Sequence, residues 1–143
     1  MNPPPLLVSF SDIEQYFSAL PSELVDEYGA EIRRLTASRL PPVASARCLS
    51  VLFGFSSKFV GAMVRRSSHY YRHFKIPKGR GKREIQAPRV ALKVIQKWLG
   101  YHLGKVIECA PCVYGFVKGR SAIQAAAVHC GAKWVYSTDI KDF

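Results

Sequence analysis

The stretch Tyr70–Pro88, YYRHFKIPKGRGKREIQAP, decides the fold class of this 143-residue chain. Residues 70–77 are rich in aromatic and β-forming side chains, and residues 83–88 form a second short strand that ends at its proline. Residues 79–82, GRGK, supply a flexible turn between the two. The stretch therefore predicts a β-hairpin, and because the segments on either side have helical spacing, we expect an α/β (α+β) fold.

Helical patterns flank the hairpin on both sides. Before it, a capping box of Ser11 and Glu14 opens the first of four segments, which are residues 11–20, 22–40, 44–55 and 56–66. After it, residues 90–107 carry apolar side chains at helical spacing, namely Leu92, Ile95, Leu99, Leu103 and Val106. Ser121 is placed to cap a further helix over 122–130, and the alternation in residues 134–140 predicts a closing β-strand.

The positive charge of the chain is concentrated in its middle. The sequence holds 21 Lys and Arg against 10 Asp and Glu, a formal net charge of +11. Residues 58–97 contain 12 basic residues and a single acid, Glu84, whereas residues 1–57 contain 4 basic and 6 acidic residues. This distribution favours a polyanionic partner, with a solvated basic face as the alternative. The basic residues form no amphipathic stripe, so we expect no membrane partner.

The sequence also indicates a cytoplasmic protein with reduced cysteines. It has no run of about 20 apolar residues to span a bilayer, and its N-terminus lacks the features of a secretory signal. Cys109 and Cys112, with His129 and Cys130, include the residue types of a zinc site. Because the second half is an adjacent pair instead of a spaced one, inert thiols are favoured over zinc.

The hairpin is the first candidate binding site. Five basic residues lie on both sides of its two glycines: Lys75, Lys78, Arg80, Lys82 and Arg83. Glycine lets backbone N–H groups approach an anion closely, and the planar fork of Arg83 suits phosphate oxygens. The hairpin thus predicts phosphate binding, and a solvated turn without a ligand is the alternative.

Two further segments carry candidate chemistry. The loop 114–124, YGFVKGRSAIQ, brings Lys118 and Arg120 to a helix N-terminus and suits a sugar-phosphate backbone. Phe116 is placed either to stack on a base or to hold the loop against the domain as a buried aromatic. Asp139 lies near the end of the expected strand, where a carboxylate can bind Mg²⁺, and Asp142 would point to the opposite face.

Taken together, these segments resemble the N-terminal part of bacterial reverse transcriptases, most of all those of retrons. The resemblance runs from about Cys48 to Phe143 and is carried by residues 52–64, 70–88, 92–99, 114–129 and 135–143 in that order. Retron enzymes tend to show an Asn-Ala pair followed two residues later by His, whereas here Ala125-Ala126 precede His129. Group II intron and abortive-infection polymerases therefore stay open as alternative relatives.

The resemblance implies roles for individual residues. Arg83 would contact the triphosphate of the incoming nucleotide, with Lys75 or Lys78 assisting, and Lys118, Arg120 and Phe116 would contact the template. Asp139 would be the first of the catalytic aspartates that bind the two Mg²⁺ ions of such polymerases. The implied divisions are an N-terminal helical region (1–67), a fingers subdomain (68–132) and the start of a palm (133–143).

The resemblance also implies what the chain acts on. The partners would be an RNA template, a DNA primer and dNTPs, with a retron non-coding RNA and a separate palm and thumb chain as further candidates. The sequence contains no Tyr-x-Asp-Asp motif, the second metal-binding motif of the family. We therefore expect a truncated polymerase that is inactive alone; a non-catalytic nucleic-acid-binding module or a polymerase remnant is the alternative.

Overall fold

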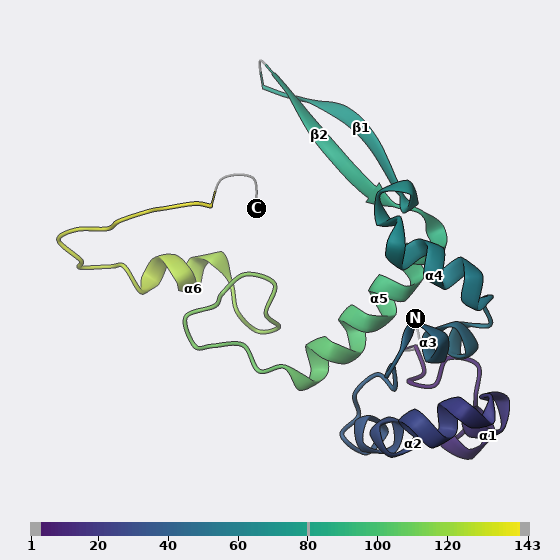
Figure 1. The fold of residues 1–143 in the computed structure, drawn as a ribbon. Helices are drawn as coiled ribbons and strands as arrows, with labels where there is room; N and C mark the ends of the chain where they lie inside the picture. The colour runs from purple at the N-terminus through teal and green to yellow at the C-terminus, as the bar shows by residue number, and fades with distance from the viewer. Residues whose placement is uncertain (1–3, 80, 141–143) are drawn as a thin grey trace. The chain divides into compact units, whose positions relative to one another are not determined.

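The computed structural model describes residues 4–79 and 81–140, and it has a mixed α+β fold (Figure 1). The described residues form six α-helices, one 3₁₀-helix and one two-stranded antiparallel sheet. In chain order the elements are α1 (Ile13–Ala19), α2 (Ser22–Ala37), α3 (Ala46–Phe53), α4 (Ser57–Arg65), η1 (Ser67–Tyr70), β1 (Tyr71–Lys78), β2 (Gly81–Pro88), α5 (Val90–Val106) and α6 (Ala122–Ala127). The chain divides into two compact units, Met1–Ile107 and Glu108–Phe143.

Side-chain caps explain where the N-terminal helices begin. The hydroxyl oxygens of Ser45 and Ser56 accept hydrogen bonds from backbone N–H groups in the first turns of α3 and α4. At α1 the expected capping box of Ser11 and Glu14 is wrong by one residue. Asp12 is the cap, and its carboxylate accepts a 2.8 Å hydrogen bond from the backbone N–H of Gln15.

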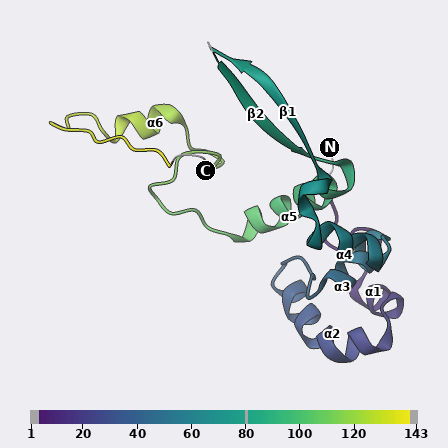
Figure 2. The ribbon, with the colours of Figure 1, turned by 45° about the horizontal axis from the view of Figure 1, so that its top comes forward.

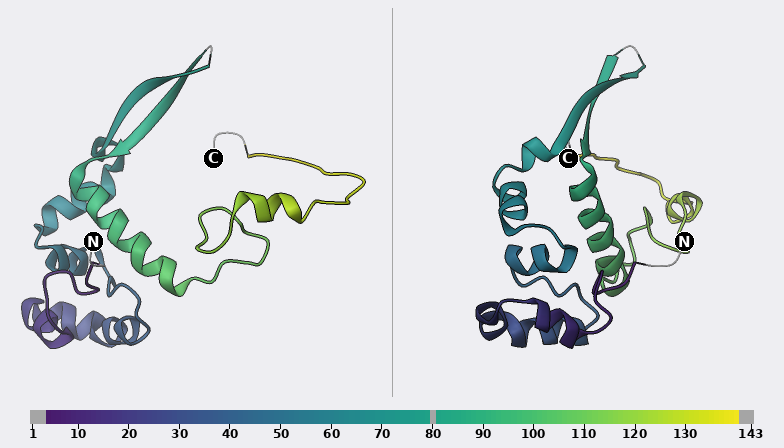
Figure 3. Two further views of the ribbon diagram at one scale, coloured as in Figure 1. Left: turned by 180° about the vertical axis from the view of Figure 1, so that it is seen from behind. Right: turned by 90° about the vertical axis from the view of Figure 1, so that its right-hand side faces the viewer.

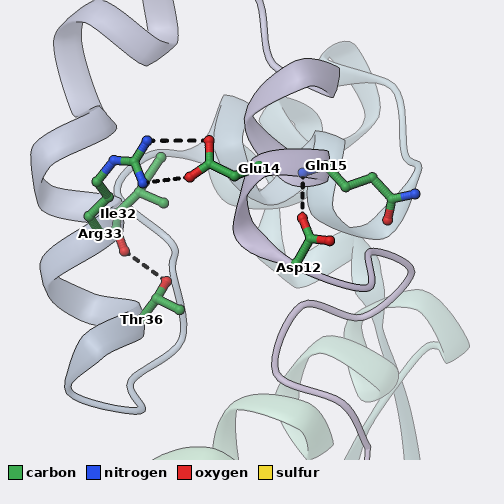
Figure 4. A network of polar contacts seen from close by, with 6 residues as sticks. All are labelled: Asp12, Glu14, Gln15, Ile32, Arg33 and Thr36. Atoms are coloured by element: carbon green, nitrogen blue, oxygen red, sulfur yellow. Dashed lines mark hydrogen bonds and ion pairs between the residues drawn. The ribbon is translucent and has the colours of Figure 1, made fainter.

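Polar contacts on the surface connect α1 to α2 (Figure 4). The guanidinium of Arg33 donates to the carboxylate of Glu14 at 2.7 Å, and it also lies 4.4 Å from the centre of the Phe17 ring. Because both partners of the ion pair are exposed, solvent screens it and it adds little to the stability of the fold. The pairing of these helices therefore depends mainly on the apolar side chains between them.

The core of the first unit joins the N-terminal helices to α5. Its buried members are Tyr16, Phe17, Leu20, Leu24, Ile32, Cys48, Leu52 and Trp98. The indole Nε1 of Trp98 donates a 3.0 Å hydrogen bond to the carbonyl of Pro5, so α5 also holds the N-terminal segment. The buried side chains of α5 are Ile95, Trp98 and His102.

The expected packing face of α5 is therefore only partly right. Of the five positions selected by their spacing, Ile95 is buried and Leu99 packs against the core, but Val106 is 40% exposed. The helix is rotated so that the large indole of Trp98 fills the core, because aromatic side chains bury the most apolar area.

The hairpin forms as predicted, but β1 lies one residue later than expected and β2 begins two residues earlier, at Gly81. Tyr71 pairs with Pro88 at its open end and Lys78 with Gly81 at its turn. Gly79 adopts φ +56°, the left-handed conformation that a two-residue hairpin turn requires and that glycine accepts readily. Figures 2 and 3 show the two strands extending beyond the helices of the first unit. Arg80, one of the expected basic residues, lies outside the described residues.

The second unit contains a loop, α6 and a segment without regular structure. Ser121 and Gln124 form a reciprocal capping box at the start of α6, as a capping role for Ser121 predicted. The helix ends at Ala127, three residues earlier than expected, and Gly131 follows with φ +83°. Among the described residues, no helix is both long enough and apolar enough to cross a membrane.

The predicted strand over residues 134–140 is not formed. These residues lie in no strand, and their large side chains are exposed, including Trp134 at 94% and Tyr136 at 90%. A strand is held by hydrogen bonds to a neighbouring strand, and no such neighbour exists among the described residues. Alternation alone therefore was not sufficient to form the element.

Candidate nucleic-acid interface

The register of the hairpin sorts its basic side chains onto two faces. Residues paired across antiparallel strands share a face, and successive residues alternate between faces. Arg83 pairs with Ile76, and Lys78 lies two positions beyond Ile76 on the same strand. Arg83 and Lys78 are therefore diagonal neighbours on one face, within reach of a common polyanion.

This face, which we call the Arg83 face, combines cations with apolar side chains. Its described members are Arg72, Phe74, Ile76, Lys78, Arg83, Ile85 and Ala87, and none of them is acidic. Phe74 is 46% exposed and Ile76 is 40% exposed. An exposed aromatic ring beside cations offers a base a stacking surface while phosphates bind the charges.

The opposite face carries Lys75, and its charge is partly neutralised. Lys75 pairs with Glu84, and Lys82 is the next basic residue on that face. The Nδ1 atom of His73 also lies 3.7 Å from a carboxylate oxygen of Glu84. Of the two lysines expected to assist Arg83, the structure therefore brings Lys78 to the same face and separates Lys75 from it.

A basic pocket at the base of the hairpin was missed by the sequence analysis. It measures about 450 Å³ and is lined by Phe59, Ala62, Arg66, His69, Tyr70, Arg89 and Ala91. The backbone N–H of Arg89 donates a 2.7 Å hydrogen bond to the carbonyl of Tyr70, which continues the pairing of the hairpin beyond its strands. The signal was available, because pairing the two strands brings residues 66–70 next to residue 89.

In the second unit, Arg120 holds its own loop together. Its Nη1 atom donates to the carbonyl oxygens of Ala110 at 2.6 Å, of Pro111 at 3.3 Å and of Val113. Guanidinium has five N–H donors in a fixed fork, so the remaining donors stay available to a phosphate. The sequence analysis expected Arg120 to contact a template, and it did not predict that this side chain also stabilises its own loop.

Phe116 and Lys118 lie at the surface of that loop. Phe116 is fully exposed and adopts φ +59°, a left-handed conformation that is an outlier for a bulky side chain. The interpretation of Phe116 as a buried aromatic that holds the loop is therefore wrong. Its exposure leaves the stacking interpretation open, and Lys118 is likewise exposed.

Asp139 lies in the irregular segment that follows α6, and its side chain is exposed. Within residues 4–79 and 81–140, no group of three or more His, Cys, Asp or Glu side chains is arranged to hold a metal ion. Each Mg²⁺ needs about six oxygen ligands, so the described residues do not fit a two-metal centre by themselves. Asp142, the second carboxylate of the sequence motif, lies outside the described residues.

The cysteines are free thiols, of which Cys48 is buried and the other three are exposed. Cys112 and His129 line one pocket of the second unit, of about 530 Å³. Two such ligands fall short of the four that a structural zinc site needs.

Comparison with known proteins identifies relatives of one kind. The chain is 35% identical over 104 residues to the Retron Se72 reverse transcriptase of Salmonella heidelberg, a match that covers 71% of this chain and 27% of the relative. It is 36% identical over 118 residues to the Retron Mx162 reverse transcriptase of Myxococcus xanthus, covering 77% of this chain and 24% of the relative. The Retron Mx65 reverse transcriptase of the same organism is 33% identical over 99 residues, or 68% of this chain and 23% of the relative.

No protein-family model matches the chain, and no solved structure does. The three relatives agree in their description and cover similar shares of the chain. The chain is therefore a homologue of retron reverse transcriptases that spans about a quarter of their length.

Proposed function

We propose that this chain is the N-terminal, fingers-type part of an RNA-directed DNA polymerase, and that its hairpin binds phosphates of nucleic acid and nucleotide. The observation that carries the proposal is the Arg83 face, an exposed surface on which cations lie beside an aromatic ring without an acid among its described members. The homology to reverse transcriptases supports the same assignment.

In this proposal the hairpin faces have different tasks. Arg83 grips phosphate oxygens through its fork, Lys78 adds a point charge beside it, and Phe74 stacks on a base. Lys75 has a lesser part because Glu84 lies opposite it. The phosphates of an incoming dNTP and of an RNA template both fit this chemistry.

The remaining predicted residues complete the proposal. Residues 68–132 are the fingers subdomain, in which Lys118, Arg120 and Phe116 contact the template strand. Asp139 supplies one carboxylate ligand to the catalytic Mg²⁺ ions, and the other ligands must come from outside the described residues. A retron non-coding RNA is a further partner in this proposal.

A pair of double variants with equal charge tests the hairpin assignment. Lys78→Gln with Arg83→Gln removes two charges from the Arg83 face, and Lys75→Gln with Lys82→Gln removes two from the opposite face. Both reduce the formal net charge from +11 to +9. Binding of a short single-stranded RNA is measured by fluorescence anisotropy over a series of salt concentrations.

For single strands the log-log salt slope changes by about 0.7 for each phosphate contact. The Arg83-face variant should therefore lose about 1.4 from the slope, and its matched control should lose less than half of that. Equal losses in the two variants would mean that only net charge matters, and the proposal would be wrong. A slope near zero in the unmodified chain would exclude phosphate contacts as the basis of binding, and the proposal would be wrong.

A nucleic-acid-binding module without catalysis is the second candidate function, and the lack of a metal-binding cluster in the described residues favours it for this chain alone. Primer extension on an RNA template with Mg²⁺ and dNTPs separates the two. We expect the purified 143-residue chain to give no templated incorporation. Templated incorporation by this chain would contradict the prediction that it is inactive alone, and it would exclude the binding module without catalysis.

A further inference from the structure

A second cationic pocket lies in the first unit and shares no residue with the candidate interface. It measures about 420 Å³ and is lined by Leu6, Arg39, His102, Lys105 and Val106. These residues come from the N-terminal segment, from the turn after α2 and from the last turns of α5. Every ionisable side chain in this described lining is a base, so the pocket suits an anion.

Arg39 occupies a position where glycine is usual. The turn after α2 is a Schellman motif, in which the N–H of Arg39 donates to the carbonyl of Thr36 at 2.9 Å and the N–H of Leu40 donates to Leu35 at 2.8 Å. Arg39 adopts φ +57°, the left-handed conformation that closes such a turn and that glycine accepts more readily than arginine. The turn holds Arg39 in the lining of the pocket.

His102 contributes a buried nitrogen that lacks a partner. Its side chain is 7% exposed, and no hydrogen-bond partner for Nε2 occurs among the described residues. The imidazole therefore belongs to the wall of the pocket, beside the carbonyl groups of Pro4 and Pro5.

The charge of His102 is sensitive to what enters the pocket. Burial lowers the pKa of His102, the neighbouring Lys105 lowers it further, and the carbonyl groups of Pro4 and Pro5 oppose this shift. The imidazole is therefore neutral near pH 7, and an arriving anion would raise its pKa by favouring the charged form.

Lys105 is held in position at the pocket. Its Nζ atom lies 4.3 Å from the centre of the Tyr101 ring, one turn earlier on α5. This cation–π contact directs the ammonium along the helix surface and limits its freedom. One cation of the pocket is thus positioned by an aromatic ring.

We propose that this pocket binds a phosphate monoester. The guanidinium of Arg39 grips two phosphate oxygens, Lys105 contributes its charge, and the ionisable imidazole of His102 adds a third positive charge when it is protonated. A monoester carries about −1.5 to −2 charges at neutral pH, which matches two permanent cations and an ionisable third better than the single charge of a diester. The phosphate belongs either to the end of a nucleic acid or to a free nucleotide.

The pocket can be tested by titrating the ¹⁵N-labelled chain with inorganic phosphate, a deoxynucleoside monophosphate, and a short RNA with either a 5′-phosphate or a 5′-hydroxyl end. The imidazole signals of His102 and its pKa are followed by NMR at constant ionic strength. We expect saturable shifts with the three monoester-type ligands and an upward shift of the pKa. No saturable shift with any of them would overturn the proposal.

The two RNA ends identify the ligand class. Tighter binding of the 5′-phosphorylated RNA, by about tenfold or more, supports a monoester site, because only that RNA offers a terminal phosphate to the cations of the pocket. Equal binding of the two RNAs would overturn the monoester assignment. If the free nucleotide binds as tightly as the phosphorylated RNA, the pocket recognises the phosphate group alone. The proposal is then supported, with a free nucleotide as the source of the phosphate.

Variants of the lining provide controls for folding and for net charge. Arg39→Gly relieves the strained backbone, so it should remain folded while weakening phosphate binding about tenfold or more. Lys105→Gln should weaken binding similarly. Lys93→Gln, an exposed position on the same helix, loses the same charge and should leave binding unchanged. An equal loss in Lys93→Gln would reduce the effect to non-specific electrostatics and overturn the assignment.

Discussion

Replacing Tyr16 by phenylalanine should change how the stability of the fold depends on pH. The Tyr16 side chain is fully buried, and its hydroxyl donates a 2.9 Å hydrogen bond to the carbonyl of Cys48. At neutral pH, loss of this bond should lower the free energy of unfolding by about 1 kcal/mol. Burial, with a smaller effect from Cys48, raises the pKa of Tyr16 far above its ordinary value of 10.0.

The raised pKa fixes the sign of the pH effect. The folded state keeps the Tyr16 proton at pH values where the unfolded state releases it. The stabilisation is therefore complete below about pH 10 and is lost above it, at about 1.4 kcal/mol per pH unit. A phenylalanine side chain has no proton to lose, so the stability of Tyr16→Phe should equal that of the unmodified chain near pH 11 and exceed it above that pH.

Denaturant unfolding at a series of pH values, followed by circular dichroism, measures this difference. Tyr136→Phe is the matched control, because Tyr136 is 90% exposed, and its unfolding curves should coincide with those of the unmodified chain at every pH. A difference between Tyr16→Phe and the unmodified chain that stays constant from neutral to alkaline pH would refute the reasoning.

Three further predictions address single side chains. Trp98→Phe should lower the free energy of unfolding by about 1–3 kcal/mol, measured by thermal denaturation, because it removes the hydrogen bond to Pro5 and leaves a cavity; an unchanged midpoint would contradict this packing. Phe116→Ala should reduce affinity for single-stranded RNA by an amount equivalent to about 1–3 kcal/mol if the exposed ring stacks on a base, and binding assays that show no change would exclude that role. Arg120→Lys should accelerate hydrogen exchange at the Val113 amide, which bonds to Ala110, since an ammonium cannot reproduce the guanidinium fork; unaltered protection would count against the loop-holding role.

The hairpin and the helices that precede it could be predicted because their signals are local. The β-forming runs and the glycines define the strands to within two residues, and serine caps define where α4 and α6 begin. Ser11 and Asp12 both favour a cap, so the sequence did not determine which of the two would act.

Tertiary placement accounts for what could not be predicted. The buried face of α5 depends on which helix packs against it, and Trp98 decided that orientation through its contacts with Phe53 and Pro5. The pocket containing Arg66 and Arg89 forms only when the strands pair, so it could be inferred from the predicted hairpin but not from local residue spacing. Residues 134–140 have the alternation of a strand, but pairing requires a neighbour that the described chain does not provide.

The opposite burial of the two tryptophans provides a separate optical probe for each unit. Trp98 is 4% exposed in the first unit, and Trp134 is 94% exposed in the second. An aqueous quencher such as iodide should reach the indole of Trp134 and leave that of Trp98 emitting in its apolar surroundings. The fluorescence that iodide does not quench comes from Trp98 and therefore reports unfolding of the helical core. The fraction that iodide quenches comes from Trp134 and should decrease when a partner covers that part of the second unit.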